Sequence, residues 1–443
     1  ASRRDHAHVP VNTTAFSLAL YHRLRAGDHT RVAESVGRIA RGADEAALRT
    51  VAWLRDRAAR DGDAATAAVF EGLAARIDPK ALPRAESEAV PLAPAVEVLA
   101  DGRLQDYERP RGEASAAAVV EELLAGRHAG LRPHGPVSDP GVGGTYATAL
   151  RALARGEVSF AGRTALVTGA SDRSIAIELV KLLLTGGARV VVTTSQLTPE
   201  RVRFYRRLFQ RHGARGAELA VVPFNQGSRQ DIQRLVHWLV STEKTTVGGT
   251  QRTVKEPWLI DLLVPFGAVG EEATLADISE RSMATLRVLL YGVEALVSEC
   301  ARAFSRLHVR ETRTHVLLPL SPNHGQFGND GLYGEAKAAL EAMLNRWGSE
   351  QAAWGRHTSV VGARIGWVRG TGLMNVNNAI APGLEARAGV RTFSAAEMGL
   401  ALAACCVDAV RDLAAETPLV ADLTGGMDAV RDLAGVARSL RAE

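Results

Sequence analysis

The strongest constraint on the fold is a series of seven apolar segments that alternate with helical segments from Val158 onward. The apolar segments span residues 164–170, 188–195, 218–225, 258–268, 314–322, 358–367 and 417–426. Each is a near-continuous apolar run, as expected of parallel strands covered on both faces. Helical segments are expected between them, at 174–186, 199–212, 228–241, 274–304, 332–355 and 395–414. We therefore predict an α/β fold with a doubly wound, seven-stranded parallel Rossmann-type sheet that binds ligands at the carboxyl ends of its strands.

The chain before this alternation has a different pattern. Residues 14–80 carry apolar positions at three- and four-residue spacing, which predicts helices. Prolines and short alternating runs near 82–112 predict an extended connector, and a Pro- and Gly-rich loop near 127–146 suggests a boundary. We expect a mostly helical structural or docking region at 1–140 and the α/β domain at 141–443, with the polar segment 241–257 inserted at the rim of the sheet.

Composition excludes several classes of protein. No apolar run approaches the ~18 residues of a membrane span, and the first residues have no signal-peptide core. The three cysteines and the 12 histidines show no disulfide or metal spacing, so we expect a cytoplasmic protein without a metal. The net charge is +4 with the basic residues scattered, which favours a solvated surface over nucleic-acid binding. A mild positive balance suits anionic partners such as a dinucleotide or an acidic carrier protein.

The first strand–helix unit has features of a phosphate-binding turn. Gly169 ends a buried strand and a helix begins near Ser174, which aims backbone N–H groups and a helix N-terminus at one point. The glycine pattern is incomplete, because Arg173 and Ala176 stand where a dinucleotide fingerprint often has glycine. Taken alone, the turn fits an ordinary strand–helix connection equally well.

The end of the second strand bears on the choice of cofactor. An acidic residue at this position would bind a ribose 2′-hydroxyl and repel a 2′-phosphate. Thr193 to Gln196 contain no acidic residue. Arg201 and Arg203 follow nearby. We therefore predict NADPH rather than NADH; the alternative is that both arginines are solvated helix residues.

A serine, a tyrosine and a lysine then suggest proton-transfer chemistry. Ser321 ends the fifth strand, Tyr333 begins the next helix, and Lys337 lies one turn further on the same face. A nearby ammonium is expected to lower the pKa of the tyrosine from ~10, and a serine hydroxyl can polarise a carbonyl oxygen. Together these groups could protonate a ketone oxygen as hydride arrives at its carbon.

At these motifs the sequence resembles short-chain dehydrogenase/reductases. The segments "VTGASDRSIA", "SPNHGQFGNDGLYGEAK" and "IGWVRGTGLM" are similar to the 3-oxoacyl-[acyl-carrier-protein] reductase (ketoreductase) region of fungal and actinobacterial type I fatty acid synthases. The resemblance covers about 145–440 strongly and 50–130 faintly. It implies NADPH-dependent reduction of 3-oxoacyl thioesters bound to a carrier protein, by a homo-oligomeric cytoplasmic enzyme. The carrier would be supplied in trans or by a parent synthase, and no nucleic acid or membrane partner is implied.

The resemblance also implies roles for individual residues. Tyr333 is the implied proton donor, Lys337 its electrostatic partner and Ser321 the ligand of the substrate carbonyl. The implied cofactor residues are Gly169, Ser171, Ser174 and Ile175 at the pyrophosphate, Thr194, Ser195 and Gln196 at the adenosine phosphate, Asn225 at the adenine, Phe266 and Gly267 beside the cofactor, and Ile365, Gly366 and Thr371 at the nicotinamide. Asn323, His324 and Met374 are predicted to contact the substrate, although support of the bend is an equal alternative for Asn323 and His324.

One departure from the family pattern leaves other functions open. Many short-chain reductases have an Asn on the long helix after the fourth strand, where it anchors a water of the proton relay, and residues 281–300 contain no Asn. A catalytically degenerate scaffold subunit is therefore one alternative. A free-standing reductase of a specialised-metabolite ketone is another. The segment 369–393 is long for a loop and predicts a lid over the substrate, or else a helical excursion without a gating role.

Overall fold

The computed structural model describes most of the chain from residue 115 onward. The described residues are 115–442, apart from 137–138, 248–249, 308–312, 373–374 and 431, together with parts of 52–74 and the strands at 9–10, 96–98 and 104–106. Most of the helices predicted within 14–80 lie outside them, but α4 (Ala64–Ala74) coincides with one. Within the predicted connector, β2 (Val96–Val98) and β3 (Leu104–Asp106) pair as an antiparallel hairpin.

A sheet of nine strands forms the centre of the molecule, and the seven predicted strands lie side by side in it, all parallel. Their order across the sheet is β7 (Glu218–Pro223), β6 (Arg189–Thr194), β5 (Thr164–Thr168), β10 (Leu262–Pro265), β11 (Thr314–Leu320), β12 (Thr358–Ile365) and β15 (Leu419–Leu423). The predicted doubly wound fold is therefore confirmed. The chain reverses its direction of travel across the sheet between β5 and β10, which is where such sheets open a crevice for ligands.

Two short antiparallel strands at the edges complete the sheet and were not predicted. β1 (Val9–Pro10) pairs with β7, and β4 (Gly130–Pro133) pairs with β15. β4 and the start of α6 (Pro140–Ala154) occupy the stretch expected to be a loop. Pro140 takes a first-turn position of the helix, and the side chain of Asp139 caps it by accepting the N–H of Gly141 at 2.8 Å. Proline and glycine here mark a helix start, and the partner of β4 lies nearly 300 residues away in the sequence.

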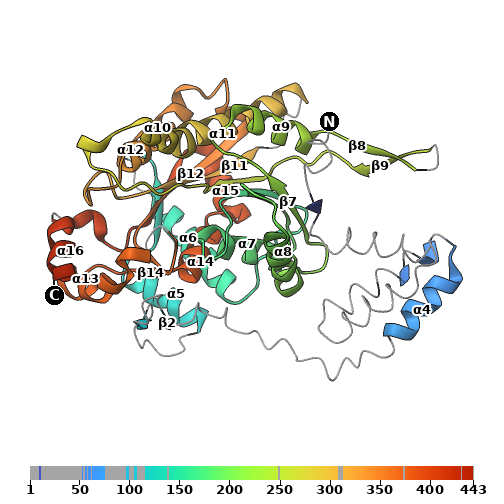
Figure 1. The fold of residues 1–443 in the computed structure, drawn as a ribbon, viewed down its shortest axis with the longest axis horizontal. Helices are drawn as coiled ribbons and strands as arrows, with labels where there is room; N and C mark the ends of the chain where they lie inside the picture. The colour runs from blue at the N-terminus through green and yellow to red at the C-terminus, as the bar shows by residue number, and fades with distance from the viewer. Residues whose placement is uncertain are drawn as a thin grey trace.

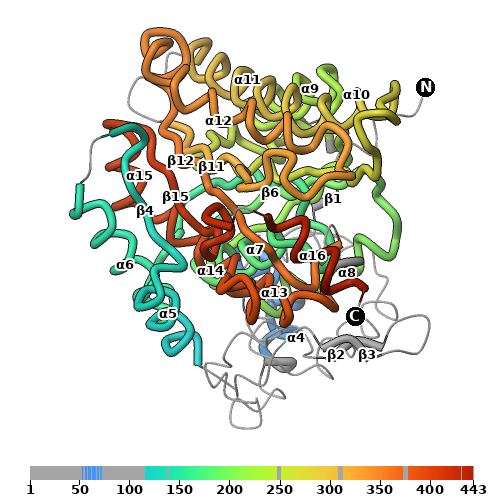
Figure 2. Tube along the Cα trace, turned by 90° about the vertical axis from the view of Figure 1, so that its left-hand side faces the viewer, coloured from blue at the N-terminus to red at the C-terminus, as the bar shows by residue number. Residues whose placement is uncertain are grey.

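Helices cover both faces of the sheet (Figures 1 and 2). One face carries α9 (Arg229–Val240), α11 (Gly292–Arg306) and α12 (Tyr333–Ser349); the other carries α5 (Ala116–Ala125), α6, α7 (Ile175–Thr185), α8 (Pro199–His212), α14 (Ala395–Ala404) and α15 (Asp408–Glu416). The side chains of successive residues in a strand point to opposite faces of the sheet. On β5, Ala165 and Val167 join the core beneath α7 while Leu166 joins the core beneath α11, and all three are fully buried.

The residues just before the first parallel strand share the core of the sheet. Val120 of α5 and Tyr146 of α6 are fully buried in the same apolar cluster as Met398 of α14. The Tyr146 hydroxyl also donates a hydrogen bond of 2.9 Å to the carbonyl oxygen of Ala401. Helices α5 and α6 therefore pack as part of the α/β body.

A smaller apolar cluster lies beyond the end of β12. It joins Trp367 and Met427 to α13 (Ala381–Ala388) and α16 (Leu433–Ala442). The segment 369–393 forms helical structure there, as one of its two alternative predictions stated. The polar segment 241–257 forms a projecting hairpin of β8 (Glu243–Val247) and β9 (Thr250–Lys255), clear in Figure 1. Within the described part of the chain, no helix has the length and apolar character needed to cross a membrane.

Candidate active site

The carboxyl ends of four neighbouring strands bring most of the predicted site residues to one edge of the sheet. Gly169 follows β5, Gly267 follows β10, Ser321 follows β11 and Ile365 ends β12. These strands are adjacent and parallel in this order, so the four residues follow one another along the edge. The edge therefore runs from the predicted phosphate turn to the predicted proton donor.

The turn after β5 has the shape of a dinucleotide turn despite its incomplete glycine pattern. Gly169 has a φ of +71°, and a Cβ there would lie 2.4 Å from the carbonyl oxygen of Phe266, so a larger residue is excluded both by the backbone and by space. Arg173 adopts a φ of 56°, the left-handed conformation for which a glycine was expected. Ser174 caps α7 by accepting the N–H of Ile177 at 3.1 Å.

Three further residues complete this turn. The hydroxyl of Ser174 donates to the carbonyl oxygen of Ser171 at 2.7 Å, and Ile175 is the first residue of α7. Ala176, which was noted as a departure from the glycine pattern, is 2% exposed and packs in the core. The turn thus presents a tight backbone and a helix N-terminus, which fit a pyrophosphate.

The two arginines that suggested a 2′-phosphate site differ in their contacts with the turn after β6. One guanidinium nitrogen of Arg201 bonds to the hydroxyl of Thr194 and lies 3.4 Å from Ser195 Oγ and 3.3 Å from the carbonyl oxygen of Gln196. Arg203 instead forms an exposed ion pair within its own helix. Only Arg201 therefore places positive charge on the turn where the 2′-phosphate is expected.

A buried glutamine forms hydrogen bonds that connect three strand ends. Gln226, which follows β7, accepts the hydroxyl hydrogen of Thr168 at 2.6 Å and donates to the carbonyl oxygens of Gly267 at 3.1 Å and Val288 at 2.9 Å. The N–H of Gly267 in turn donates to the Thr168 hydroxyl at 2.8 Å. This network fixes the turns after β5 and β10 relative to each other. The sequence carried no local signal for it, because its members are far apart in the chain.

The long helix expected at 274–304 contains a π-helical turn where Gln226 meets it. It consists of a short 3₁₀ turn (Leu275–Asp277), α10 (Glu280–Leu286), a π-helical turn (Arg287–Tyr291) and α11. A Cβ on Gly292 would lie 2.3 Å from the backbone oxygen of Gln226, so this close approach requires glycine. π-Helical turns are frequent at functional sites. Although this helix lacks the family Asn, an amide from Gln226 does reach it.

Ser321, Tyr333 and Lys337 lie together. Tyr333, the first residue of α12, lies near enough to Ser321 for the serine hydroxyl to act on its pKa. Lys337 is one turn further along α12, and its Nζ lies 5.4 Å from the centre of the Tyr333 ring. Ser321 and Lys337 are 6% and 5% exposed. The arrangement brings a proton donor, a second hydroxyl and a buried amine close together.

The pKa values in this group differ from the expectation. Burial raises the pKa of Tyr333, the Ser321 hydroxyl lowers it, and nearby Asp330 raises it, with a net increase. Burial also lowers the pKa of Lys337 to about 7, and its Nζ donates to the carbonyl oxygen of Pro319 at 2.6 Å. The predicted lowering of the tyrosine pKa is not found, because burial and the charge of Asp330 outweigh the effect of Ser321. A raised pKa keeps the proton on Tyr333 at neutral pH.

Asn323 shapes the bend between Ser321 and Tyr333. Its backbone N–H donates to Ser321 Oγ at 3.1 Å, and its side chain donates to Asp330 at 2.9 Å. The side-chain oxygen accepts the N–H groups of Gly325 at 3.2 Å and Phe327 at 3.4 Å. These contacts support the bend from within, which was one of its two predicted roles.

The remaining predicted residues occupy different positions. His324 lies 3.6 Å from Glu341, which is itself paired with Arg364. Thr371 donates to the carbonyl oxygen of Val368 at 3.1 Å. Met374 lies outside the described residues. The others lie at strand ends as expected: Asn225 after β7, Phe266 after β10 and Gly366 after β12.

Glu271 is a further residue that the sequence did not reveal. Its carboxylate accepts hydrogen bonds from Ser282 and from Thr285 at 2.8 Å, and contacts the N–H of Leu332 at 3.4 Å, just before Tyr333. The hydrogen bond from Ser282 is the main reason that the pKa of this carboxyl is lowered. Glu271 thus links α10 to the start of α12. No cluster of His, Cys, Asp or Glu suited to a metal ion occurs in the described part of the chain.

Comparison with known proteins reveals homologues among fungal synthases. The chain is 42% identical over 302 residues to fatty acid synthase subunit alpha of Penicillium patulum, covering 68% of this chain and 16% of that protein. It is 41% identical over 288 residues to the corresponding subunit of Saccharomyces cerevisiae, covering 65% of this chain and 15% of that protein. The chain thus spans about a sixth of the length of these relatives. No family model matches it.

Solved structures with a similar arrangement are dehydrogenases. One is described as a putative NAD(P)-dependent gluconate 5-dehydrogenase from Beutenbergia cavernae with bound NADP, with a TM-score of 0.48 and 20% identity, covering 61% of this chain and 98% of that one. Another is a short-chain dehydrogenase/reductase from Serratia marcescens, with a TM-score of 0.44 and 18% identity, covering 60% of this chain and 98% of that one.

Proposed function

We propose that the chain is an NADPH-dependent reductase that converts 3-oxoacyl thioesters on an acyl carrier protein into 3-hydroxyacyl thioesters for fatty acid synthesis. The observation that carries the proposal is the close grouping of Ser321, Tyr333 and Lys337 on the same sheet edge as the Gly169 turn. The homologous synthase subunits support the pathway. The carrier protein would be supplied in trans or by a parent synthase.

The cofactor site would extend along the sheet edge. The tight turn at Gly169 and the N-terminus of α7 suit a pyrophosphate, and Arg201 with Thr194 suits a 2′-phosphate. The Gln226 network would hold the neighbouring turn at Gly267 in place. When bound, NADPH supplies the hydride that reduces C3 of the substrate.

Residues of the chain would bind and protonate the carbonyl oxygen of the substrate. Ser321 would donate a hydrogen bond to the C3 carbonyl oxygen, and Tyr333 would transfer its hydroxyl proton to that oxygen as C3 is reduced. The raised pKa of Tyr333 keeps this proton available. The ammonium form of Lys337, close to the ring, would stabilise the phenolate that remains. The product is the 3-hydroxyacyl thioester.

The proposal is tested by following the absorbance of NADPH mixed with the protein and an acetoacetyl thioester of N-acetylcysteamine. We expect oxidation by the wild type and a loss of roughly 10²- to 10⁴-fold in Tyr333→Phe, the range for a general acid. Thr148→Val is the control, because it removes an exposed hydroxyl from α6, outside the proposed site. A wild type that binds no NADPH and oxidises none would instead support the scaffold alternative.

We also propose that the protein acts as a homo-oligomer. A groove between α11 and α12, lined by Tyr291, Met343 and Trp354 among others, would supply the contact. Light scattering coupled to size-exclusion chromatography tests this, and a monomeric mass would contradict it.

A further inference from the structure

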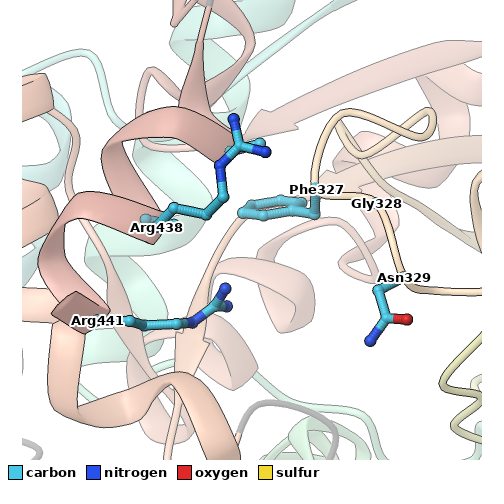
Figure 3. A pocket seen from close by; sticks show the side chains of 7 residues that line it. Phe327, Gly328, Asn329, Arg438 and Arg441 are labelled. Atoms are coloured by element: carbon cyan, nitrogen blue, oxygen red, sulfur yellow. The ribbon is translucent and has the colours of Figure 1, made fainter.

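A cavity lies between α16 and the bend that carries the catalytic residues. It has a volume of about 290 Å³ and is lined by Phe327, Gly328 and Asn329 of the bend and by Ala434, Ala437, Arg438 and Arg441 of α16. Figure 3 shows both guanidinium groups extending from the helix toward Phe327 and Asn329. The size is near the lower end of the range for small-ligand pockets.

The cavity is joined to the active site through the bend. Phe327 lies about midway between Ser321 and Tyr333 in the chain, and its N–H is held by Asn323, whose own N–H bonds to Ser321. The Phe327 ring meets the ring of Trp367 edge-on, with 5.8 Å between centres. Since Trp367 follows the end of β12, the cavity lies beside the mouth of the proposed substrate site.

The helix that supplies the arginines is firmly positioned. A Cβ on Gly383 of α13 would lie 2.5 Å from the Leu440 side chain, so the two helices are in close contact there. Arg387 of α13 also donates to Ser439 Oγ at 3.1 Å. A rigid helix can hold charged groups toward a cavity without a large loss of side-chain and backbone entropy on binding.

Two arginines of α16 place positive charge on the face of the helix that lines the cavity. Arg438 and Arg441 are three residues apart, so they lie on one face, where like charges repel each other. The dipole of the helix favours cations in its last turn, but it does not explain why both guanidinium groups line one cavity.

We propose that Arg438 and Arg441 form a subsite for a phosphate group, namely the phosphate at the far end of the pantetheine arm that carries the thioester substrate. The inference rests on the proposed function, because it assigns the phosphate to that substrate. Two arginines present several N–H donors in a planar geometry that matches phosphate oxygens, and the amide of Asn329 can add another donor. Phe327 would cover the apolar part of the arm.

The test compares two thioesters that differ only in the phosphate: acetoacetyl-pantetheine and acetoacetyl-4′-phosphopantetheine. For the wild type we expect a higher kcat/KM with the phosphorylated form. In Arg438→Gln/Arg441→Gln, kcat/KM for this form should fall roughly 10- to 100-fold, while the unphosphorylated thioester and the KM for NADPH stay within about twofold. Unchanged NADPH kinetics separate this phosphate from those of the cofactor, and Arg438→Lys/Arg441→Lys should retain most of the preference because it keeps the charge.

The control is Arg207→Gln/Arg211→Gln, which removes two exposed arginines from α8. Equal kcat/KM for both thioesters in a wild type that reduces them would overturn the subsite and leave the proposed function standing. The same holds if the control loses as much as the pocket variant. Titration calorimetry with 4′-phosphopantetheine measures binding to the subsite without catalysis. Binding that disappears in Arg438→Gln/Arg441→Gln supports the subsite even if neither thioester is reduced. The absence of binding to the wild type overturns the subsite.

Discussion

Replacing Arg201 with methionine gives the sharpest test of the cofactor site. In the structure one guanidinium nitrogen reaches Thr194, Ser195 and Gln196 at the end of β6. A 2′-phosphate bound at this turn would gain one or two charge-assisted hydrogen bonds, each contributing about 1.5–3 kcal/mol. Because Arg201 is partly exposed, the lower part of that range applies, and 1.4 kcal/mol corresponds to a tenfold change. We expect the KM for NADPH to rise roughly 10- to 100-fold.

The assay measures steady-state kinetics with NADPH and with NADH for the wild type, Arg201→Met and Arg203→Met. NADH has no 2′-phosphate, so its KM should change by about twofold at most in Arg201→Met, since only contacts within the β6 turn are lost. Arg203 is the matched control: it lies two residues away on the same helix, is 59% exposed and pairs with Glu200. Its replacement should leave both cofactors unaffected.

Two results would refute this reasoning. If Arg201→Met weakened NADPH and NADH equally, the arginine would support the turn and not recognise a phosphate. If Arg203→Met raised the KM for NADPH as much as Arg201→Met did, general positive charge on α8, and not the geometry of the β6 turn, would select the cofactor.

Three further predictions concern stability. Burial lowers the pKa of Lys337 to about 7, whereas in the unfolded chain it is ~10.4. The unfolded chain therefore binds more protons between these pH values, and the free energy of unfolding should rise with pH there by up to about 1.4 kcal/mol per pH unit. Lys337→Met should remove this rise in urea titrations at several pH values; an unchanged slope would contradict it. Gly169→Ala should destabilise by at least about 2 kcal/mol, because its Cβ would meet Phe266 at a positive φ, and a wild-type urea midpoint would disprove the clash. Gln226→Leu should lower the free energy of unfolding by roughly 2–4 kcal/mol, because the Thr168 hydroxyl loses its acceptor and two carbonyls lose their donor. The control Gln233→Leu, at an exposed position of α9, should change it by no more than about 0.5 kcal/mol. Equal losses in the two variants would show that the Gln226 network does not stabilise the fold.

Much of the fold was predictable because its signals are local. The seven parallel strands and the helices between them follow from apolar runs and from apolar spacing along the chain. The edge strand β4 was missed, because Gly130–Pro133 pairs with a strand that is distant in the sequence. The π-helical turn within the helix expected at 274–304 was missed for the same reason, since it accommodates Gln226 from the turn after β7.

The sequence by itself determined the order of the strands along the chain, the glycine turn and the one-turn spacing of Tyr333 and Lys337, because neighbours in the chain set backbone conformation and helix faces. The roles of these residues stay predictions. Only the tertiary structure decided that Arg201 and not Arg203 reaches the turn, and that the pKa of Tyr333 rises. It alone placed Arg438 and Arg441 beside the bend between Ser321 and Tyr333. Burial and electrostatic contact depend on which distant segments exclude water from a group, and that information exists only once the chain is folded.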